Sequence, residues 1–233
     1  MTIHDISPVF RADMPCWPGD IPFGVERVAR IEDGSTVNVS RIVISSHVGS
    51  HADAPLHYRA DGASIAEVVL EPFIGKCHLV DARGSTGATI GLEILARLPE
   101  RVERVLIRQY DRQPDCWDPD LKGIDPVLVA ELARRGVRLI GTDAASVDPS
   151  DSKTLPAHRA LDAHDIRIVE GLLLDSVAAG EYELVALPLK LTGCDGAPVR
   201  AILRLPSVVG LAPSGHEPIS TCGSAEAPIR GSP

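Results

Sequence analysis

Short runs of β-branched residues, separated by turn residues, constrain the fold of this chain more than any other feature of its sequence. Six runs have the length and composition of strands: 25–30 (VERVAR), 38–45 (NVSRIVIS), 76–81 (KCHLVD), 104–109 (RVLIRQ), 182–191 (YELVALPLKL) and 198–206 (PVRAILRLP). The fifth run is interrupted by Pro188, which cannot donate a ladder hydrogen bond. The pattern predicts a domain rich in strands.

One segment carries helix signals at both ends and is followed at once by an apolar run. Asp125 is a candidate N-cap, Pro126 occupies the first helical position and Gly136 follows the last turn. The next run, 137–143, reads as a buried strand, which gives the segment βαβ character. Two shorter helix candidates lie at 63–72 and 91–99. Strands and helices together predict a mixed α/β fold.

Three of the eight histidines and one aspartate lie close together in the sequence, at His47, His51, Asp53 and His57. In a straight strand all four side chains would share one face, but His47 and His51 would lie ~13 Å apart at ~3.3 Å per residue. Two ligands of one metal ion lie closer, because metal–nitrogen bonds are about 2.0–2.1 Å long. Gly49 permits the bend that brings them together. We therefore expect a strand that runs into a tight loop, with these side chains on its concave side.

The residue types in this cluster are those of a metal site. His47, His51 and Asp53 offer two imidazoles and a carboxylate, a set that suits zinc, manganese or iron and leaves a coordination position open. An open position allows a metal to acidify bound water, as hydrolysis requires. His57 could be a further ligand or a general acid and base beside the metal, and both roles stay open.

Composition argues against several classes of partner. The formal net charge is −9 without a block of lysine or arginine, whereas nucleic acid and anionic membranes require a basic face. No apolar run reaches the ~18 residues of a membrane helix, and the first residues have no secretory pattern. The five cysteines are scattered without a CxxC pair, which favours reduced thiols. We expect a cytoplasmic protein with no nucleic-acid or membrane partner.

The chain of 233 residues suits one sizeable domain. From residue 207 onward the sequence is rich in Gly, Pro and Ser and has little apolar periodicity. We predict a single domain over 1–206 and a loosely ordered tail over 207–233. The sequence has no GxSxG, GxxxxGK[ST] or GxGxxG motif, so a serine nucleophile elbow, a phosphate-binding loop and a dinucleotide site are unsupported.

The histidine cluster and its surroundings resemble a known family. The segment HVGSHADAPLHY is similar to the HxGTHxDxPxH motif of the metal-dependent cyclase family, with Ser50 in place of threonine. Longer stretches, 37–65, 139–175 and 182–204, resemble more narrowly the bacterial kynurenine formamidases (arylformamidases) of that family. The resemblance extends from about Asp5 to Arg204 and implies an α/β fold, a strand-rich swivelling β/β/α domain.

The resemblance also implies a site with two divalent metal ions per subunit, zinc in most descriptions and manganese as the other candidate. Carried over by position, the ligands would be His47, His51, Asp53, His158 and Glu170. Asp53 would be shared by both ions, the two preceding histidines completing one site and the two later residues the other. His57 would donate and accept protons, and Trp17 would lie against the aromatic ring of the substrate.

The reaction that the resemblance implies is hydrolysis of N-formyl-L-kynurenine to L-kynurenine and formate, a step of tryptophan degradation. A hydroxide activated by two metals would attack, and a homodimer would be the assembly. Other branches of the family share the metal motif, so an amide or lactam hydrolase such as an isatin hydrolase is the first alternative. The second is a non-catalytic metal-binding module whose ion is enclosed by four ligands.

Overall fold

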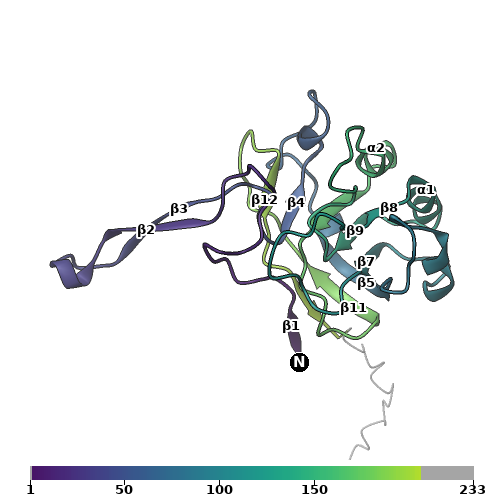
Figure 1. Ribbon diagram of the computed structural model, residues 1–233, viewed down its shortest axis with the longest axis horizontal. Coiled ribbons are helices and arrows are strands. Elements are labelled where there is room, and N and C mark those ends of the chain that lie inside the picture. Colours follow the sequence, from purple (N-terminus) through teal and green to yellow (C-terminus); the bar gives the residue numbers. More distant parts are fainter. Residues whose placement is uncertain (1, 206–233) are drawn as a thin grey trace, which may run out of the picture.

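A nine-stranded sheet forms the centre of the computed structural model, which describes residues 2–205. Its strands are β1 (Ile3–Asp5), β4 (His51–Asp53), β5 (Ile74–Asp81), β7 (Arg104–Arg108), β9 (Leu139–Thr142), β10 (Arg167–Glu170), β11 (Gly180–Val185), β12 (Gly196–Pro198) and β13 (Ile202–Arg204). Their order across the sheet is β1-β13-β11-β5-β7-β9-β10-β4-β12 (Figure 1). The sheet is therefore assembled from segments far apart in the sequence.

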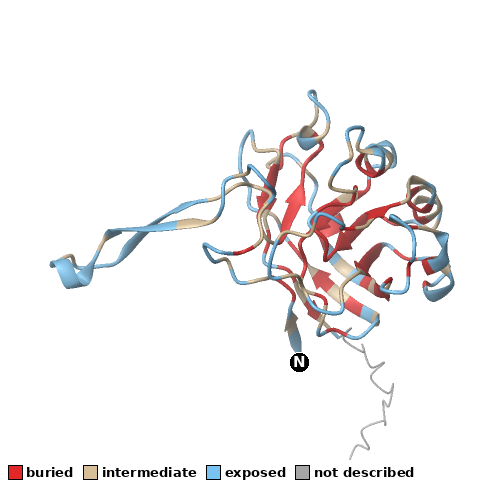
Figure 2. Ribbon diagram, viewed as in Figure 1, coloured by how far each residue is buried: buried red, intermediate tan, exposed pale blue. Residues whose placement is uncertain are grey.

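The middle of this sheet is parallel and both flanks are antiparallel. Strands β5, β7, β9 and β10 pair in parallel, whereas β11 and β13 on one side and β4 and β12 on the other pair antiparallel. Central parallel strands are covered on both faces. This burial explains why β7 and β9 are nearly continuous apolar runs instead of alternating ones (Figure 2).

Helices cover one face of the sheet. They are α1 (Pro126–Arg134), α2 (Pro156–Ala163) and the 3-10 helix η4 (Leu92–Arg97). Leu132 of α1 and Leu161 of α2 are buried with Ile107 and Ile140 of the sheet. On the other face Leu106 belongs to a second apolar cluster. Successive side chains of β7 point to opposite faces of the sheet, so this one strand contributes to both clusters. Burial of each side chain of this size stabilises the fold by about 1.5–3 kcal/mol.

Two small sheets are separate from the nine-stranded sheet. One pairs β6 (Thr89–Ile90) with β8 (Gly123–Ile124), and the other pairs β2 (Gly24–Ala29) with β3 (Val39–Val43). The β2–β3 hairpin, with the 3-10 helix η1 (Ile31–Asp33) at its end, projects from the body as an arm (Figure 1). No residue of the arm, 20–45, is buried. Two further 3-10 helices are η2 (Pro55–His57) and η3 (Glu71–Phe73).

The structure confirms the strand-rich α/β fold and the helix with its predicted ends. Asp125 accepts a hydrogen bond from the Val127 backbone N–H at 2.7 Å, as an N-cap does. Gly136, just past the helix, has a φ of 92°. Within the described residues, no helix is long and apolar enough to cross a membrane. The predicted tail, 207–233, lies outside the described residues.

Several local expectations were wrong. The helix expected over 63–72 is replaced by turns that end in η3, and the backbone N–H of Ile65 donates to the distant Cys194 carbonyl at 2.9 Å, which ties this segment to the loop before β12. The candidate at 91–99 is the 3-10 helix η4, and the run 198–206 is divided between the end of β12 and β13. Helix α2 was not expected, although Pro156 at its first position is a start signal.

Candidate metal centre

The expected bend lies between β3 and β4. Gly49 has a φ of 67°, and a Cβ there would lie 3.0 Å from the ring of Phe10. Both the backbone conformation and the close contact favour glycine. Beyond the bend the chain does not remain a loop but forms β4, where His51 and Asp53 are two residues apart. Their side chains therefore point to the same face of the sheet.

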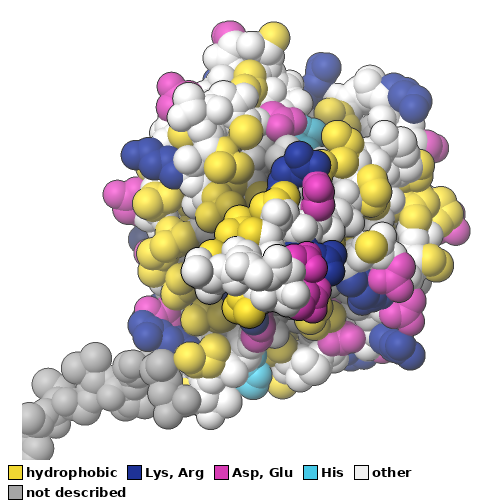
Figure 3. All heavy atoms as spheres, turned by 90° about the vertical axis from the view of Figure 1, so that its left-hand side faces the viewer, with side chains coloured by type: hydrophobic (Ala, Val, Ile, Leu, Met, Phe, Trp, Pro, Cys, Tyr) yellow, Lys and Arg dark blue, Asp and Glu magenta, His cyan; other side chains and the backbone are white. Residues whose placement is uncertain are grey.

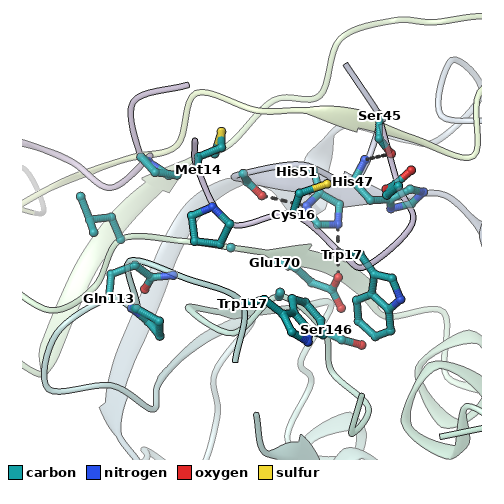
Figure 4. A pocket seen from close by; sticks show the side chains of 18 of the residues that line it. Met14, Cys16, Trp17, Ser45, His47, His51, Gln113, Trp117, Ser146 and Glu170 are labelled. Atoms are coloured by element: carbon teal, nitrogen blue, oxygen red, sulfur yellow. Dashed lines mark hydrogen bonds and ion pairs between the residues drawn. The ribbon is translucent and has the colours of Figure 1, made fainter. Parts of the chain in front are cut away.

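Strand pairing brings Glu170 to this cluster. In the antiparallel pair of β10 and β4, Glu170 lies opposite His51, and His51 Nε2 lies 3.2 Å from Glu170 Oε2 (Figure 4). The other oxygen, Oε1, accepts a hydrogen bond from the Val147 backbone N–H at 2.8 Å. A Cβ at position 171 would lie 2.3 Å from the Gly49 carbonyl oxygen, so Gly171 allows the two segments to approach.

His158 reaches the same point from helix α2. Its Nε2 lies 3.4 Å from Asp53 Oδ2 and 3.8 Å from Glu170 Oε1. Its Nδ1 donates to Asp148 Oδ2 at 2.7 Å. The Asp148 carboxylate also accepts the backbone N–H groups of Ala157 and His158, which are otherwise unsatisfied in the first turn of a helix. Asp148 therefore fixes the start of the helix and the orientation of the imidazole together.

Four residues form the inner group of the site: His51, Asp53, His158 and Glu170. The exposed fraction of each is at most 3%. Three buried atoms in this group, His51 Nε2, Asp53 Oδ2 and His158 Nε2, have no hydrogen-bond partner in the described structure. Buried polar atoms are nearly always satisfied, so an unpartnered set of this kind is suited to binding a further group such as a metal ion.

The hydrogen bonds of the two imidazoles show which atoms are free to bind such a group. Nδ1 of His51 donates to the Gly49 carbonyl at 2.9 Å, and Nδ1 of His158 donates to Asp148. In the neutral imidazole, which is the form that binds a metal, each Nε2 therefore presents a lone pair, in the arrangement typical of metal-ligating histidines. Two such nitrogens beside the carboxylates of Asp53 and Glu170 fit a divalent metal ion.

An outer group of His47, His57 and Asp195 lies on the solvent side. His47 Nδ1 lies 3.0 Å from Asp53 Oδ1, and His47 Nε2 lies 2.9 Å from Asp195 Oδ2. His57 Nδ1 lies 3.4 Å from the same oxygen of Asp195, and its ring centroid is 4.0 Å from that of His47. The side chain of His57 is 32% exposed. His47 thus connects the inner group to the outer one.

The carboxylates of both groups favour positive charge on the imidazoles. Burial opposes protonation of His158, but its hydrogen bond to Asp148 and the nearby carboxylate of Asp53 outweigh it and raise its pKa to about 10. In the same way, contacts with Asp53 and Asp195 outweigh burial and raise the pKa of His47 to about 9. Burial opposes the charged form of Asp53, but the adjacent imidazoles of His158 and His47 hold the pKa of this carboxyl well below its usual range. An electric field of this sign also stabilises a bound cation.

Three triads have ligand atoms that all lie within 4.8 Å of one another: His47–His51–Asp53, Asp53–His57–His158 and His47–His57–Asp195. The first is the triad expected from the sequence. The second shares Asp53 with the first, so two neighbouring ions could use this carboxylate in common. His57 appears in two triads, which makes it compatible with a ligand role as well as with proton transfer.

A cavity of about 730 Å³ opens onto both groups. Trp17 and Trp117 line it with their rings edge to face, at a centroid separation of 4.7 Å and an interplanar angle of 66° (Figure 4). Charged side chains of both signs also line the cavity, among them Arg112 and Asp175. The cavity can therefore hold a flat aromatic molecule that carries charged substituents.

The structure brings together all seven residues singled out from the sequence, namely Trp17, His47, His51, Asp53, His57, His158 and Glu170. Sequence reasoning missed Asp148, Asp195 and Trp117. Asp195 is 148 positions from His47, and no local signal distinguishes it among 32 acidic residues. Trp117 offered a usable signal, because the chain has only two tryptophans.

Three solved structures share this fold over nearly their full length. A potential metal-dependent hydrolase with cyclase activity is 29% identical, with a TM-score of 0.75 over 88% of this chain and 99% of that one. A predicted metal-dependent hydrolase from Bacillus stearothermophilus is 28% identical, with a TM-score of 0.74 over 87% and 97%. Isatin hydrolase A from Labrenzia aggregata, bound to benzyl benzoate, is 25% identical, with a TM-score of 0.75 over 88% and 93%.

The sequence itself matches the family described as putative cyclase over residues 4–149, which is more than half of the chain. This range contains the bend at Gly49, strand β4 and the first histidine cluster. The similar structures extend the likeness through α2 and β10, which carry the remaining inner residues. The chain belongs to the putative cyclase family.

Proposed function

We propose that this protein is a metal-dependent arylformamidase that hydrolyses N-formyl-L-kynurenine to L-kynurenine and formate. The observation that carries the proposal is the inner group, in which His51 and His158, each with an unpartnered Nε2, line a cavity that two tryptophans also line. A donor set that faces a cavity can bind a metal and still leave room for a substrate. The similarity to metal-dependent hydrolases supports the reaction class.

We infer that the site holds two divalent ions, with zinc or manganese as the candidates. His47, His51 and Asp53 would hold one ion, and Asp53, His158 and Glu170 would hold the other. When bound, the ions would lower the pKa of water and polarise the formyl carbonyl. The hydrogen bond from His158 to Asp148 would keep the Nε2 lone pair directed at its ion.

His57 would carry the proton. Hydrolysis cleaves the bond between the formyl carbon and the aniline nitrogen, so the carbon gains the hydroxyl part of water and the nitrogen gains a proton. His57 lines the cavity, and its Nδ1 lies 3.4 Å from Asp195 Oδ2, which leaves Nε2 to face the reactants. A histidine in this position can take the proton from water and return it to the departing nitrogen, a role worth roughly 10²–10⁴-fold in rate.

The walls of the cavity suit the rest of this substrate. The edge-to-face pair of Trp17 and Trp117 provides apolar surface for the aniline ring. N-formyl-L-kynurenine also carries an α-amino and an α-carboxylate group. Arg112 and Asp175, which line the cavity, offer a charge of the opposite sign to each.

A second candidate function is hydrolysis of a lactam such as isatin. The observation that favours it is the 25% identity to isatin hydrolase A over most of both chains. Isatin is flat and aromatic, so it also suits the tryptophans. It has no amino-acid group, however, that could engage the charged side chains of the cavity. A closed, non-catalytic metal module is less well supported, because the cavity borders the donor atoms directly.

The test is hydrolysis of N-formyl-L-kynurenine and isatin by the purified full-length chain. Each substrate is assayed with protein as purified, after chelation, and after addition of zinc or manganese, with Asp53→Asn as the inactive control. We expect turnover of N-formyl-L-kynurenine that chelation abolishes and metal restores. Turnover of isatin alone would reject N-formyl-L-kynurenine as the substrate, while the proposed metal site would stand. Activity that survives chelation, in protein shown to be free of metal, would reject the metal-dependent reaction.

A further inference from the structure

Leu155 has a backbone conformation that is costly for its residue type. Its φ of 48° and ψ of 56° lie in the left-handed region, where the Cβ atom comes too close to the following carbonyl oxygen. The next residue is Pro156, and a residue before proline favours extended conformations. Of the described residues other than glycine, only Leu155 and Asp165 have a positive φ. Aspartate tolerates this region better than leucine does.

The turn at Leu155 does not itself require a side chain. The backbone N–H of Leu155 donates to Ser152 Oγ at 3.2 Å, and its carbonyl accepts the backbone N–H of Arg159 at 3.0 Å, at the start of α2. These bonds use backbone atoms of Leu155 that every residue except proline has. Glycine would therefore form the same turn without the steric cost. The reason for leucine lies in its side chain.

Core packing does not supply that reason. Leu155 is half-buried and, among the described residues, belongs to neither of the two apolar clusters. Exposed apolar side chains are common on this protein and gather on the face from which the arm projects (Figure 3), but their backbones have no positive φ. Strained backbone is found chiefly at functional sites, where the surrounding structure maintains it. Leu155 is therefore a candidate functional residue.

Leu155 lines the cavity close to the inner group. The start of α2 contributes two residues to the cavity lining, Leu155 directly before the helix and His158 in its first turn. Residues three positions apart at one end of a helix are close neighbours. The proposed function assigns His158 to a metal ion and the aniline ring to the two tryptophans, which line the cavity from separate loops. Leu155 is thus beside the point where the substrate carbonyl would react.

We propose that Leu155 determines which acyl group the site accepts. Its branched side chain occupies the space beside the reacting carbonyl, so that the hydrogen of a formyl group fits there and the methyl of an acetyl group does not. The two backbone hydrogen bonds of Leu155 keep this side chain from moving away, as exclusion of a larger group requires. The inference rests on the proposed function, since it concerns the substrate class of the same site.

The test compares N-formyl-L-kynurenine with its acetyl analogue, in which the same aniline nitrogen carries acetyl, as substrates of the zinc-loaded full-length chain. The intrinsic reactivity of each amide is the same for every variant, so a change in the ratio of the two kcat/KM values reports on the site. Leu155→Ala should lower the preference for formyl by roughly tenfold or more, chiefly by raising kcat/KM for the acetyl analogue. Leu155→Met keeps an apolar side chain of similar size and should retain the preference.

Urea unfolding tests the backbone strain separately from activity. Leu155→Gly and Leu155→Ala both remove the branched side chain, but only glycine adopts a positive φ without cost. Leu155→Gly should therefore be the more stable of the two, by roughly threefold or more in the unfolding equilibrium constant, the reverse of the usual order. Asp165 is the matched control, because it has a positive φ but is exposed and outside the cavity lining. Asp165→Gly and Asp165→Ala should show the same order of stability and leave the preference for formyl unchanged.

The outcomes distinguish failure of this inference from failure of the proposed function. A wild type that hydrolyses N-formyl-L-kynurenine, with an unchanged preference for formyl in Leu155→Ala and Leu155→Gly, would overturn the inference alone. If Leu155→Ala folds poorly, Leu155→Gly gives the same test without the strain. Greater stability of Leu155→Ala than of Leu155→Gly would also contradict the inference, as would loss of the preference in Leu155→Met. A wild type that hydrolyses neither compound would overturn the proposed function and this selectivity with it.

Discussion

The inner and outer groups of the site differ in how the fold holds them. The inner residues come from β4, β10 and α2, and they are at most 3% exposed. The outer residues come from a turn, a 3-10 helix and a loop, and the side chain of Asp195 is 43% exposed. Strand pairing fixes His51, Asp53 and Glu170 in advance, and helix α2 with Asp148 fixes His158, as metal binding requires. The outer side chains have the access to solvent and substrate that proton transfer requires.

The largest expected effect comes from removing the residue that touches both groups. Asp53 lies within 3.5 Å of nitrogen atoms in His47, His51 and His158. Asp53→Asn should remove bound metal and lower kcat/KM by roughly 10³-fold or more, because one change weakens the whole unit. Metal analysis and kinetics on the same preparation check this. The matched control is Asp61→Asn at a side chain that is 87% exposed, and full metal content in Asp53→Asn would contradict the shared role.

The second prediction distinguishes the role of the outer group from that of the inner group by measuring metal content and kcat in one variant. His57→Asn should keep its metal and lose roughly 10²–10⁴-fold in kcat, the range for a lost general acid and base. The same substitution at the exposed His164, outside the cavity, should change neither quantity. Loss of metal from His57→Asn would make this residue a ligand, and an unchanged kcat would remove it from the reaction.

A smaller effect is expected from Asp148, which contacts the inner group but does not belong to it, and the quantity affected is metal affinity. Asp148→Asn removes the carboxylate that orients His158 while it preserves size and one acceptor oxygen. Residues in such positions typically contribute 10–100-fold in metal affinity. Titration of the metal-free variant with zinc should show a weaker dissociation constant in this range. An affinity equal to that of the wild type would show that the helix alone positions His158.

The cavity wall should affect binding more than chemistry. Trp117→Ala should raise KM for N-formyl-L-kynurenine by about tenfold with little change in kcat, because a lost edge-to-face ring contact and its apolar area amount to roughly 1–2 kcal/mol. Trp117→Phe, which keeps an aromatic ring, should recover most of the loss. A fall in kcat without a change in KM would assign this residue to the reaction itself.

The smallest effect on activity should come from substituting Asp143, a buried acid outside both groups. Its expected effect is on the pH dependence of stability. Burial raises the pKa of Asp143 to about 7, although backbone N–H groups of Gln109 and Tyr110 oppose this. The folded state then holds a proton on Asp143 more tightly than the unfolded state does. The contribution of this group to the free energy of unfolding is therefore fully present below about pH 4 and is lost as pH rises toward 7. Asp143→Asn cannot ionise, and its stability relative to wild type should increase over this range in urea unfolding. A pH-independent difference would contradict the shifted pKa.

The part of the site that could be predicted from the sequence is the part set by local spacing, and the part set by long-range strand pairing could not be predicted. The pattern around Gly49 predicted the bend and the His47–His51–Asp53 triad, because spacing and residue type within a few positions limit the geometry. The pairing of β4 with β10, which places Glu170 opposite His51, depends on a register that no local pattern encodes. Only family resemblance pointed to His158 and Glu170.

Two of the missed residues, Asp195 and Trp117, act across long sequence separations. Asp195 reaches His47 and His57 from a loop before β12, and Trp117 meets Trp17 from a separate loop. The segment 63–72, where a helix was expected, is likewise held by a distant contact, from the Ile65 N–H to the Cys194 carbonyl. Tertiary hydrogen bonds overrode local propensity in that segment.

The most direct test of the division between the two groups is the number of divalent ions retained per chain after gel filtration. Wild type, Asp53→Asn and His57→Asn are to be measured side by side. The account predicts two ions in the wild type, two in His57→Asn and fewer than one in Asp53→Asn. A wild type without bound metal, or a His57→Asn variant that loses its ions as Asp53→Asn does, would contradict it.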